Sequence, residues 1–292
     1  MKLFSINTGF FKLDGGAMYG VVPKTIWNKL TPADENNLTN WAIRSLLIQE
    51  DDKLILIDTG NGTKQSEKFF SYYFLNGDDS LEKSLAKNSF TKNDITDVIL
   101  THLHFDHCGG AIDKQGDQLS PAFKNATYWS TEAHWNWATK PNDREKASFL
   151  KENILPIQES GQLKFVELNS PIEDGFQLHP SAISKNISFF IANGHTNSML
   201  VPVIQCNGKT IAYAADLLPS VFHLPVSYVP GYDMFPLTSM QEKKIFLKNA
   251  LENNYVLFFE HDPFNECCTL KLTEKGIRQN EIFKLEELTT EH

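Results

Sequence analysis

The sequence lacks any run of about 18 apolar residues, the length that a membrane-spanning helix requires, so we expect no membrane partner. Its first residues also lack an apolar stretch long enough for a signal peptide. Positive charge is scarce, with 27 Lys and Arg against 36 Asp and Glu and a net charge of −9. Because an acidic surface repels phosphate backbones, we expect no nucleic-acid partner.

Cysteine is also scarce. The chain has 4 Cys, without CxxC spacing, which predicts reduced thiols and a cytoplasmic location rather than a disulfide framework. A glycine-rich phosphate-binding loop is missing as well, because Gly109 and Gly110 lack the required spacing and the lysine. These absences argue against secreted disulfide scaffolds and nucleotide-binding folds.

What the chain does contain is enough apolar material for a sizeable core, with 41% hydrophobic residues and 21 Phe. No repeat, low-complexity tract or Pro/Gly-rich linker divides it. We therefore predict a single domain over residues 1–292.

Short apolar runs bounded by turn residues predict strands, and longer amphipathic stretches predict helices. Strands are expected at 41–49, 53–58, 98–101, 124–130, 187–191, 199–204, 210–214 and 255–260. Helices are expected at 66–75, 131–139 and 143–154, and from a capping box at Thr238 and Gln241 to about Glu252. Paired strands with interspersed helices predict an α/β (α+β) fold of two sheets sandwiched between helices, rather than a parallel βαβ sheet.

The most informative motif is the hexapeptide HLHFDH at residues 102–107, directly after a predicted strand. His102 and His104 are able to bind one cation, and Asp106 and His107 a second. Imidazole and carboxylate groups suit a divalent ion such as Zn²⁺. The motif therefore predicts a metal site.

Three further side chains stand at the ends of predicted strands: His195, Asp216 and His261. Each alone has an ordinary explanation as a polar residue at a strand end. Together with the hexapeptide they predict a larger set of ligands, in which the Asp216 carboxylate is able to bridge two metal ions.

With these residues the chain resembles the metallo-β-lactamase-fold hydrolase superfamily, from about Leu3 to beyond His261. The resemblance implies an αββα four-layer sandwich with the site at one edge of the sheets. It also implies a ligand set: His102, His104 and His195 on one metal, Asp106, His107 and His261 on the other, Asp216 between them, and Asp58 supporting the ligands.

Within the superfamily the chain is most similar to quorum-quenching N-acyl-homoserine lactonases. The likeness rests on DGGAMYGVVPK at 14–24, ADLLP at 215–219 and YDMFP at 232–236. It implies two Zn²⁺ ions, with Mn, Co or Fe as alternatives, and attack of a metal-bridging hydroxide on a small lactone or ester. Asp106 and Asp216 are the expected catalytic carboxylates, with Asp106 passing a proton to the leaving oxygen. A homodimer through residues 9–27 is also expected.

One departure concerns the substrate. Some lactonases carry a Tyr three residues after the bridging Asp, where this chain has Pro219, so His223 or Tyr228 is a candidate for the missing donor. The residues expected to line the pocket are Met18, Phe105, Phe222, His223, Tyr228, Met234 and Phe235. Cys108 and His134 are expected to be ordinary packing or surface residues.

Other functions use the same metal pair. A phosphotriesterase or a glyoxalase II-like thioesterase differs from a lactonase only in the pocket. The tail at 267–292 is short and mixed in charge, which disfavours the glutathione-binding type. A non-catalytic metal-binding ligand sensor is the alternative of another class.

Overall fold

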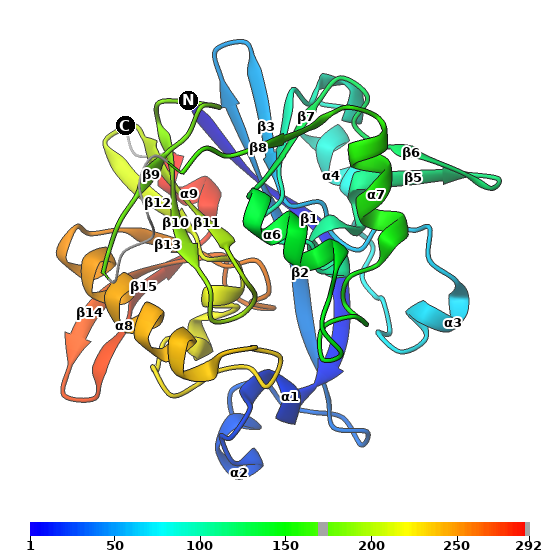
Figure 1. The fold of residues 1–292 in the computed structure, drawn as a ribbon. Coiled ribbons are helices and arrows are strands. Elements are labelled where there is room, and N and C mark those ends of the chain that lie inside the picture. Colours follow the sequence, from blue (N-terminus) through cyan, green and yellow to red (C-terminus); the bar gives the residue numbers. More distant parts are fainter. Residues whose placement is uncertain (169–174, 290–292) are drawn as a thin grey trace.

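A computed structural model describes residues 1–168 and 175–289. Two sheets lie face to face, with α4, α6 and α7 outside one and α8 outside the other (Figure 1). The predicted αββα sandwich is therefore confirmed.

The first sheet has the order β1-β2-β3-β4-β7-β8. Its strands are Lys2–Asp14, Leu38–Glu50, Lys53–Ile57, Asp97–Ile99, Thr127–Ser130 and Leu163–Phe165. β2 and β3 form the predicted antiparallel hairpin, whereas β3, β4, β7 and β8 run parallel. The sequence disfavoured a parallel βαβ sheet, but these four strands pair in parallel, because helical segments connect them and return the chain in the same direction.

The second sheet has the order β15-β14-β13-β12-β11-β10-β9. Its strands, β9 to β15 in chain order, are His179–Pro180, Ile187–Ala192, Met199–Cys206, Lys209–Tyr213, Val256–Phe258, Cys267–Thr273 and Gly276–Phe283. β11 and β12 are joined by Asn207 and Gly208, with φ of 51° and 78°. Positive φ at both residues is the geometry that an Asn-Gly hairpin turn favours, as the sequence predicted.

Helices cover the outer faces. In chain order, α1 to α9 span Gly15–Tyr19, Lys24–Trp27, Glu67–Phe70, Leu81–Lys87, Phe105–Cys108, Glu132–Thr139, Lys151–Glu159, Pro236–Glu252 and Leu285–Thr289. Short 3-10 turns η1 to η4 lie at Lys92–Asp94, Gly109–Ala111, Ala215–Leu217 and Val221–His223, and β5 (Ile112–Gln115) pairs with β6 (Gln118–Pro121) as a separate hairpin. None of the helices in the described ranges has the length and apolarity that a bilayer crossing requires.

The alternating direction of side chains along the central strands explains the four layers. In β2 and β3, Leu46 and Ile57 point into the core between the sheets. Their neighbours Leu47 and Leu56 point the other way, into the core beneath the outer helices. Successive side chains face opposite sides of a sheet, so strands that are apolar at every position need cover on both faces.

Three predicted helices were wrong in extent. The segment 143–150 forms turns, and α7 begins only at Lys151, because Glu145 is held by Trp137 and Asn142 instead of lying on a helix face. The expected capping box is absent, since Pro236 begins α8 and places Thr238 inside the helix. Within 66–75 only Glu67–Phe70 is helical.

The sequence reasoning also missed β1 and the β14–β15 hairpin. The register of β1 against β2 shifts between Asn7 and Gly9, so a bulge interrupts the alternation that marks a strand. The C-terminal hairpin has one largely exposed face, which weakens its apolar signal.

Helix α8 carries a buried lysine that holds the loop around residues 225–228. Lys243 is 1% exposed, and its Nζ donates to Pro225 O at 3.0 Å and Tyr228 O at 2.7 Å. Burial lowers the pKa of Lys243 to about 7. The unfolded chain keeps this amine protonated to about pH 10.4, so over this interval it holds more protons than the folded chain.

We therefore predict that the contribution of Lys243 to the free energy of unfolding rises with pH between 7 and 10, by up to about 1.4 kcal/mol per pH unit. Urea unfolding of wild type and Lys243→Met at pH 7 and at pH 9.5 measures it. The stability of the wild type relative to the variant should increase with pH. The control is Lys244→Met at the exposed neighbouring residue, for which the difference in unfolding free energy from the wild type should not change with pH. A difference for Lys243→Met that is also independent of pH would contradict the prediction.

Candidate metal centre

The hexapeptide forms a tight turn behind the end of β4. His104 is the N-cap of the short helix α5, which carries Asp106 and His107. Two glycines allow this turn to pack: a Cβ on Gly109 or Gly110 would lie 2.1 Å from a backbone oxygen of the segment 59–61. The turn therefore needs glycine at both positions to bring its side chains to the sheet edge.

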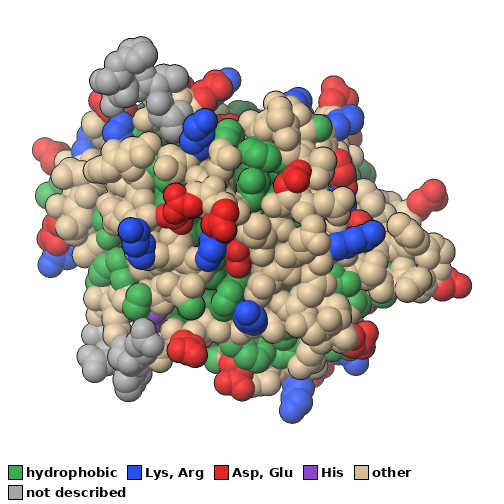
Figure 2. Space-filling view, turned by 90° about the horizontal axis from the view of Figure 1, so that it is seen from above, with side chains coloured by type: hydrophobic (Ala, Val, Ile, Leu, Met, Phe, Trp, Pro, Cys, Tyr) green, Lys and Arg blue, Asp and Glu red, His purple; other side chains and the backbone are tan. Residues whose placement is uncertain are grey.

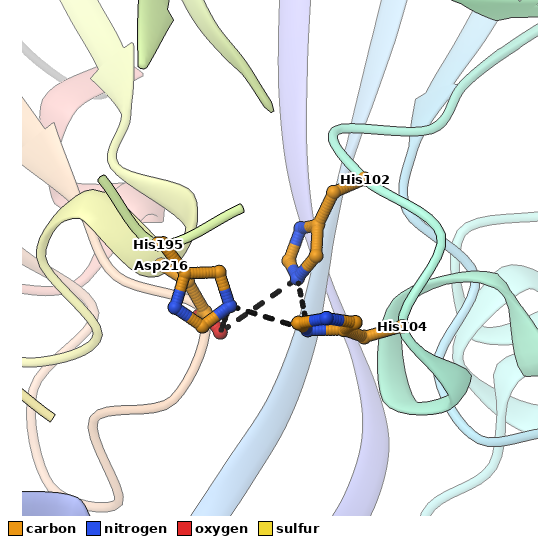
Figure 3. A group of neighbouring side chains, drawn as sticks. All are labelled: His102, His104, His195 and Asp216. Atoms are coloured by element: carbon orange, nitrogen blue, oxygen red, sulfur yellow. Dashed lines mark hydrogen bonds and ion pairs between the residues drawn. The ribbon is translucent and has the colours of Figure 1, made fainter. Parts of the chain in front are cut away.

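One group of side chains consists of His102, His104, His195 and Asp216. His104 Nδ1 lies 3.0 Å from His102 Nε2 and 3.2 Å from His195 Nε2. Asp216 Oδ2 lies 3.1 Å from His195 Nε2. Figure 3 shows His102 and His104 entering from one half of the molecule and His195 and Asp216 from the other.

A second group consists of Asp106, His107 and His261. The Nε2 atoms of His107 and His261 are 3.2 Å apart. Asp106 Oδ2 lies 3.7 Å from the first and 3.8 Å from the second. Asp216 reaches this group too, with Oδ1 at 3.2 Å from His261 Nε2, so its carboxylate lies between the two groups.

The outer nitrogen of each imidazole faces an oxygen atom. His107 Nδ1 is 3.1 Å from Asp58 Oδ2, and His195 Nδ1 is 2.9 Å from Asp233 Oδ1. The remaining partners are Thr101 Oγ1 for His102, Glu145 Oε1 for His104 and Ala42 O for His261. A proton on the outer nitrogen leaves the inner lone pair free, which is the tautomer a metal ligand needs.

The spacing of the inner atoms fits a tetrahedral ion. Zn–N bonds of about 2.0–2.1 Å place neighbouring ligand atoms about 3.3 Å apart. Apart from its ion-pair distance to His261 Nε2, the buried Asp216 Oδ1 has no hydrogen-bond partner within the described chain, as expected of an oxygen that binds a cation. Burial, together with the nearby imidazoles, holds the pKa of His102 well below its usual range, which keeps its lone pair available.

A third group, formed by Asp58, His107 and Glu260, lies behind His107. Glu260 Oε2 is 3.0 Å from His107 Nδ1, on the side of the ring that already faces Asp58. Asp58 has a φ of 57° and accepts from both the backbone N–H and the hydroxyl of Thr101. Asp58 and Glu260 therefore both lie within hydrogen-bonding distance of the outer nitrogen of His107.

Sequence reasoning missed the other residues that hold the rings. Glu145 follows a predicted helix start, and Asp233 lies in a loop, so no local pattern marks them. His134 is fully buried and bridges two loops: its Nε2 accepts from Leu103 N at 2.9 Å, and its Nδ1 lies 2.6 Å from Asn197 O. It joins the hexapeptide turn to the loop that carries His195.

Cys108 packs as predicted. Its side chain is fully buried, its Sγ–H donates to Leu103 O at 3.3 Å, and burial raises the pKa of its thiol to about 12. It belongs to none of the groups described above. All 4 Cys are free thiols.

A cavity of about 370 Å³ opens in front of the two groups. His104, Asp106, His195, Asp216 and His261 reach it. Its apolar walls come from Phe11, Leu13, Met18, Phe105, Pro219, Pro230 and Met234, and its further polar side chains from Tyr73, Arg144, Glu145, Ser148 and Tyr232. A cavity of this size and character suits a small, mainly apolar molecule.

Of the expected pocket residues, Met18, Phe105 and Met234 line this cavity, whereas Phe222, His223, Tyr228 and Phe235 do not. His223 is buried, with Nδ1 2.8 Å from Ser220 Oγ and Nε2 2.9 Å from Met18 O, so both nitrogens are occupied. Tyr228 packs edge-on against Tyr19.

The other two residues outside the lining are also engaged elsewhere. Phe222 packs against Phe264, and Phe235 lies beside Trp137 at the start of α8. Nearness in sequence to a ligand was a poor guide here, because the loop turns away from the site. In particular, neither His223 nor Tyr228 is placed to replace the donor missing at Pro219.

An αββα sandwich with paired His/Asp groups at one edge of its sheets defines a class of metal-dependent hydrolases. The profile of the Metallo-beta-lactamase superfamily matches residues 38–261. The chain belongs to this superfamily and is a hydrolase.

Curated relatives share a name. The chain is 28% identical over 275 residues to an N-acyl homoserine lactonase of Bacillus cereus, covering 89% of this chain and 93% of that protein. It is 25% identical over 214 residues to an N-acyl homoserine lactonase of Bacillus thuringiensis, covering 69% and 74%.

Solved structures agree with these relatives. A probable metal-dependent hydrolase from Staphylococcus aureus superposes with a TM-score of 0.81 at 26% identity, covering 97% of this chain and 98% of that one. AidC, a dizinc quorum-quenching lactonase in complex with an N-hexanoyl-L-homoserine product, superposes with a TM-score of 0.77 at 25% identity, covering 97% and 95%.

We predict that Asp58→Asn lowers the affinity for Zn²⁺ by about 10- to 100-fold, because His107 loses the carboxylate that orients its ring. Titration against a competing chelator measures this affinity. The matched control is Asp97→Asn, which alters a buried carboxylate in β4 of the same sheet and should leave the affinity unchanged. Equal zinc affinity in wild type and Asp58→Asn would contradict the assigned role.

Proposed function

We propose that the protein is a lactonase that opens N-acyl-homoserine lactones, or closely related lactones, at a pair of zinc ions. The observation that carries the proposal is the convergence of two His/Asp groups that share Asp216 at the base of an apolar-walled cavity. The N-acyl homoserine lactonase of Bacillus cereus, which this chain matches over 93% of that protein's length, supports the same substrate class.

His102, His104 and His195 would hold one ion, and Asp106, His107 and His261 the other, with Asp216 between them. Ions bound there supply Lewis-acid polarisation of the lactone carbonyl and a water activated for attack. The protein's part is to orient each ring so that its inner nitrogen points at the ion, which the oxygen partners of the outer nitrogens support.

Asp106 is the residue we assign to proton transfer. Its carboxylate borders the cavity and lies within 3.8 Å of His261 Nε2. From this position it is able to hold the proton released by the attacking water and to deliver it to the leaving oxygen of the opened ring. The reaction then adds one water and yields an acyl-homoserine with a free carboxylate and hydroxyl.

The surface is compatible with a small neutral substrate. In Figure 2, Lys and Arg side chains are interspersed with Asp and Glu on the face that is drawn. A mixed surface of this kind does not concentrate a polyanion, whereas a small apolar lactone needs only the cavity. We propose that the enzyme acts on a free small molecule and works in the cytoplasm, consistent with its four free, buried thiols.

We also propose that the chain acts as one domain and forms a homodimer through residues 9–27. Support comes from Val21, which is 92% exposed at the end of α1.

We predict that the purified chain takes up two Zn²⁺ and hydrolyses N-hexanoyl-homoserine lactone, and that His104→Ala lowers kcat/KM at least about 100-fold, because the ion held with His102 and His195 loses a ligand. Acid release in a pH-stat measures turnover. His179→Ala, which removes an imidazole from β9, is the matched control and should retain activity near that of wild type.

Two parallel assays distinguish the lactonase from the alternative hydrolases. The zinc-loaded protein is also offered a phosphotriester and a glutathione thioester. If it turns over one of these and leaves the lactone intact, the lactonase proposal is wrong and the corresponding alternative replaces it. If it binds two ions and hydrolyses none of the three, the assigned substrate class is wrong as well.

A further inference from the structure

The cavity lacks a hydrogen-bond donor at Pro219. This residue borders the cavity three positions after Asp216, and a proline there offers no side-chain hydrogen-bond donor. An acylamino lactone presents two carbonyl groups, one on the ring and one on the amide. With the ring carbonyl directed to the His/Asp groups, the amide oxygen needs a donor from another wall.

Tyr73 also borders the cavity, and neighbouring residues hold its backbone and ring. Its N–H donates to Phe70 O at 3.0 Å and its carbonyl accepts from Lys12 N at 2.7 Å. Its ring centroid lies 4.5 Å from that of Phe105 and 5.0 Å from that of Phe69. Burial, with a further contribution from the Asp106 carboxylate, raises the pKa of Tyr73 to about 12.

Tyr232 lies beside it, between two anchored residues. Gly231 donates its N–H to Ala17 O at 2.7 Å and accepts a hydrogen bond from Arg144 at its carbonyl. On the other side, Asp233 is fixed to His195 at 2.9 Å. The Tyr232 side chain is 40% exposed, and partial burial raises its pKa, with further contributions from Asp14, Tyr73 and Asp106.

Neither hydroxyl has a hydrogen-bond partner among the residues that the structure describes, although both side chains border the cavity. Both phenols stay protonated at neutral pH, so each keeps an O–H to donate. Donors without a protein partner at a cavity favour a ligand that brings its own acceptor, and the packed ring of Tyr73 loses little conformational freedom on binding.

We infer that Tyr73 and Tyr232 bind the substrate by donating hydrogen bonds to the amide carbonyl oxygen of an acylamino lactone. The pair thereby selects lactones that carry an amide over simple aliphatic lactones. This inference rests on the proposed lactonase function and assigns its specificity to one wall of the cavity.

The test compares two substrates, N-hexanoyl-homoserine lactone and γ-decalactone, which has no amide. Tyr73→Phe and Tyr232→Phe remove one hydroxyl each and keep the rings. Each variant should raise KM for the homoserine lactone about 3- to 10-fold with kcat little changed, because a bond made equally in the ground and transition states is lost. Both should leave kcat/KM for γ-decalactone within about twofold of wild type.

The control is Tyr72→Phe, which alters the neighbouring tyrosine. That side chain is 63% exposed and outside the cavity lining, so kcat and KM for both substrates should stay unchanged. Unchanged KM for the homoserine lactone in both cavity variants and in their double mutant overturns the inference. So does an equal loss on both substrates, which indicates a structural role. A zinc-loaded wild type that opens neither lactone overturns the proposed function itself, and the inference with it.

Discussion

Five imidazole rings face one another between the two sheets, and this crowding is the constraint on which the rest of the structure depends. The inner nitrogens of His102 and His104 approach to 3.0 Å, and those of His107 and His261 to 3.2 Å. Since the outer nitrogens face oxygen acceptors, the inner ones present lone pairs to each other. Two lone pairs at this distance repel unless a positive charge lies between them, and the spacing matches the one that ligands of a tetrahedral ion such as Zn²⁺ would have.

The centre exists only where the two halves of the chain meet. The hexapeptide turn belongs to the first half, whereas His195, Asp216 and His261 follow strands of the second sheet. Backbone hydrogen bonds from Leu200 N to Thr101 O, at 2.9 Å, and from Ala42 N to His261 O, at 3.1 Å, join the halves beside the rings. Metal binding at such a seam would stabilise the packing of both sheets, because the ligands are brought together only in the folded chain.

Sequence reasoning recovered the parts of the site that have a local signal. Four candidate ligands lie within the hexapeptide, and the other three stand at strand ends, where a polar side chain after an apolar run is conspicuous. Glu145 and Asp233 have no such signal, since each reaches its ring from a loop whose path depends on tertiary contacts. The helix predicted over 143–154 failed for the same reason: partners of Glu145 outside that segment hold it in a turn.

The cavity wall was the hardest part to predict. Met18, Phe105 and Met234 line it, but Tyr73 follows a short helix whose only sequence signal is an aromatic cluster. Its backbone carbonyl is held by a hydrogen bond from Lys12 N, which no local pattern predicts. Tyr232 belongs to the YDMFP segment, whose sequence carried family likeness but no indication of which side chain faces the cavity. The lining of the cavity therefore depends on loop geometry that composition and periodicity do not encode.

Anomalous diffraction from crystals grown with zinc, recorded on both sides of the zinc absorption edge, tests the central claim most directly. The account predicts two peaks per chain, one among His102, His104 and His195 and one among Asp106, His107 and His261, each about 2 Å from its ligand atoms with Asp216 between them. A zinc-saturated crystal without a peak at either position, or with its peaks on other side chains, would contradict it.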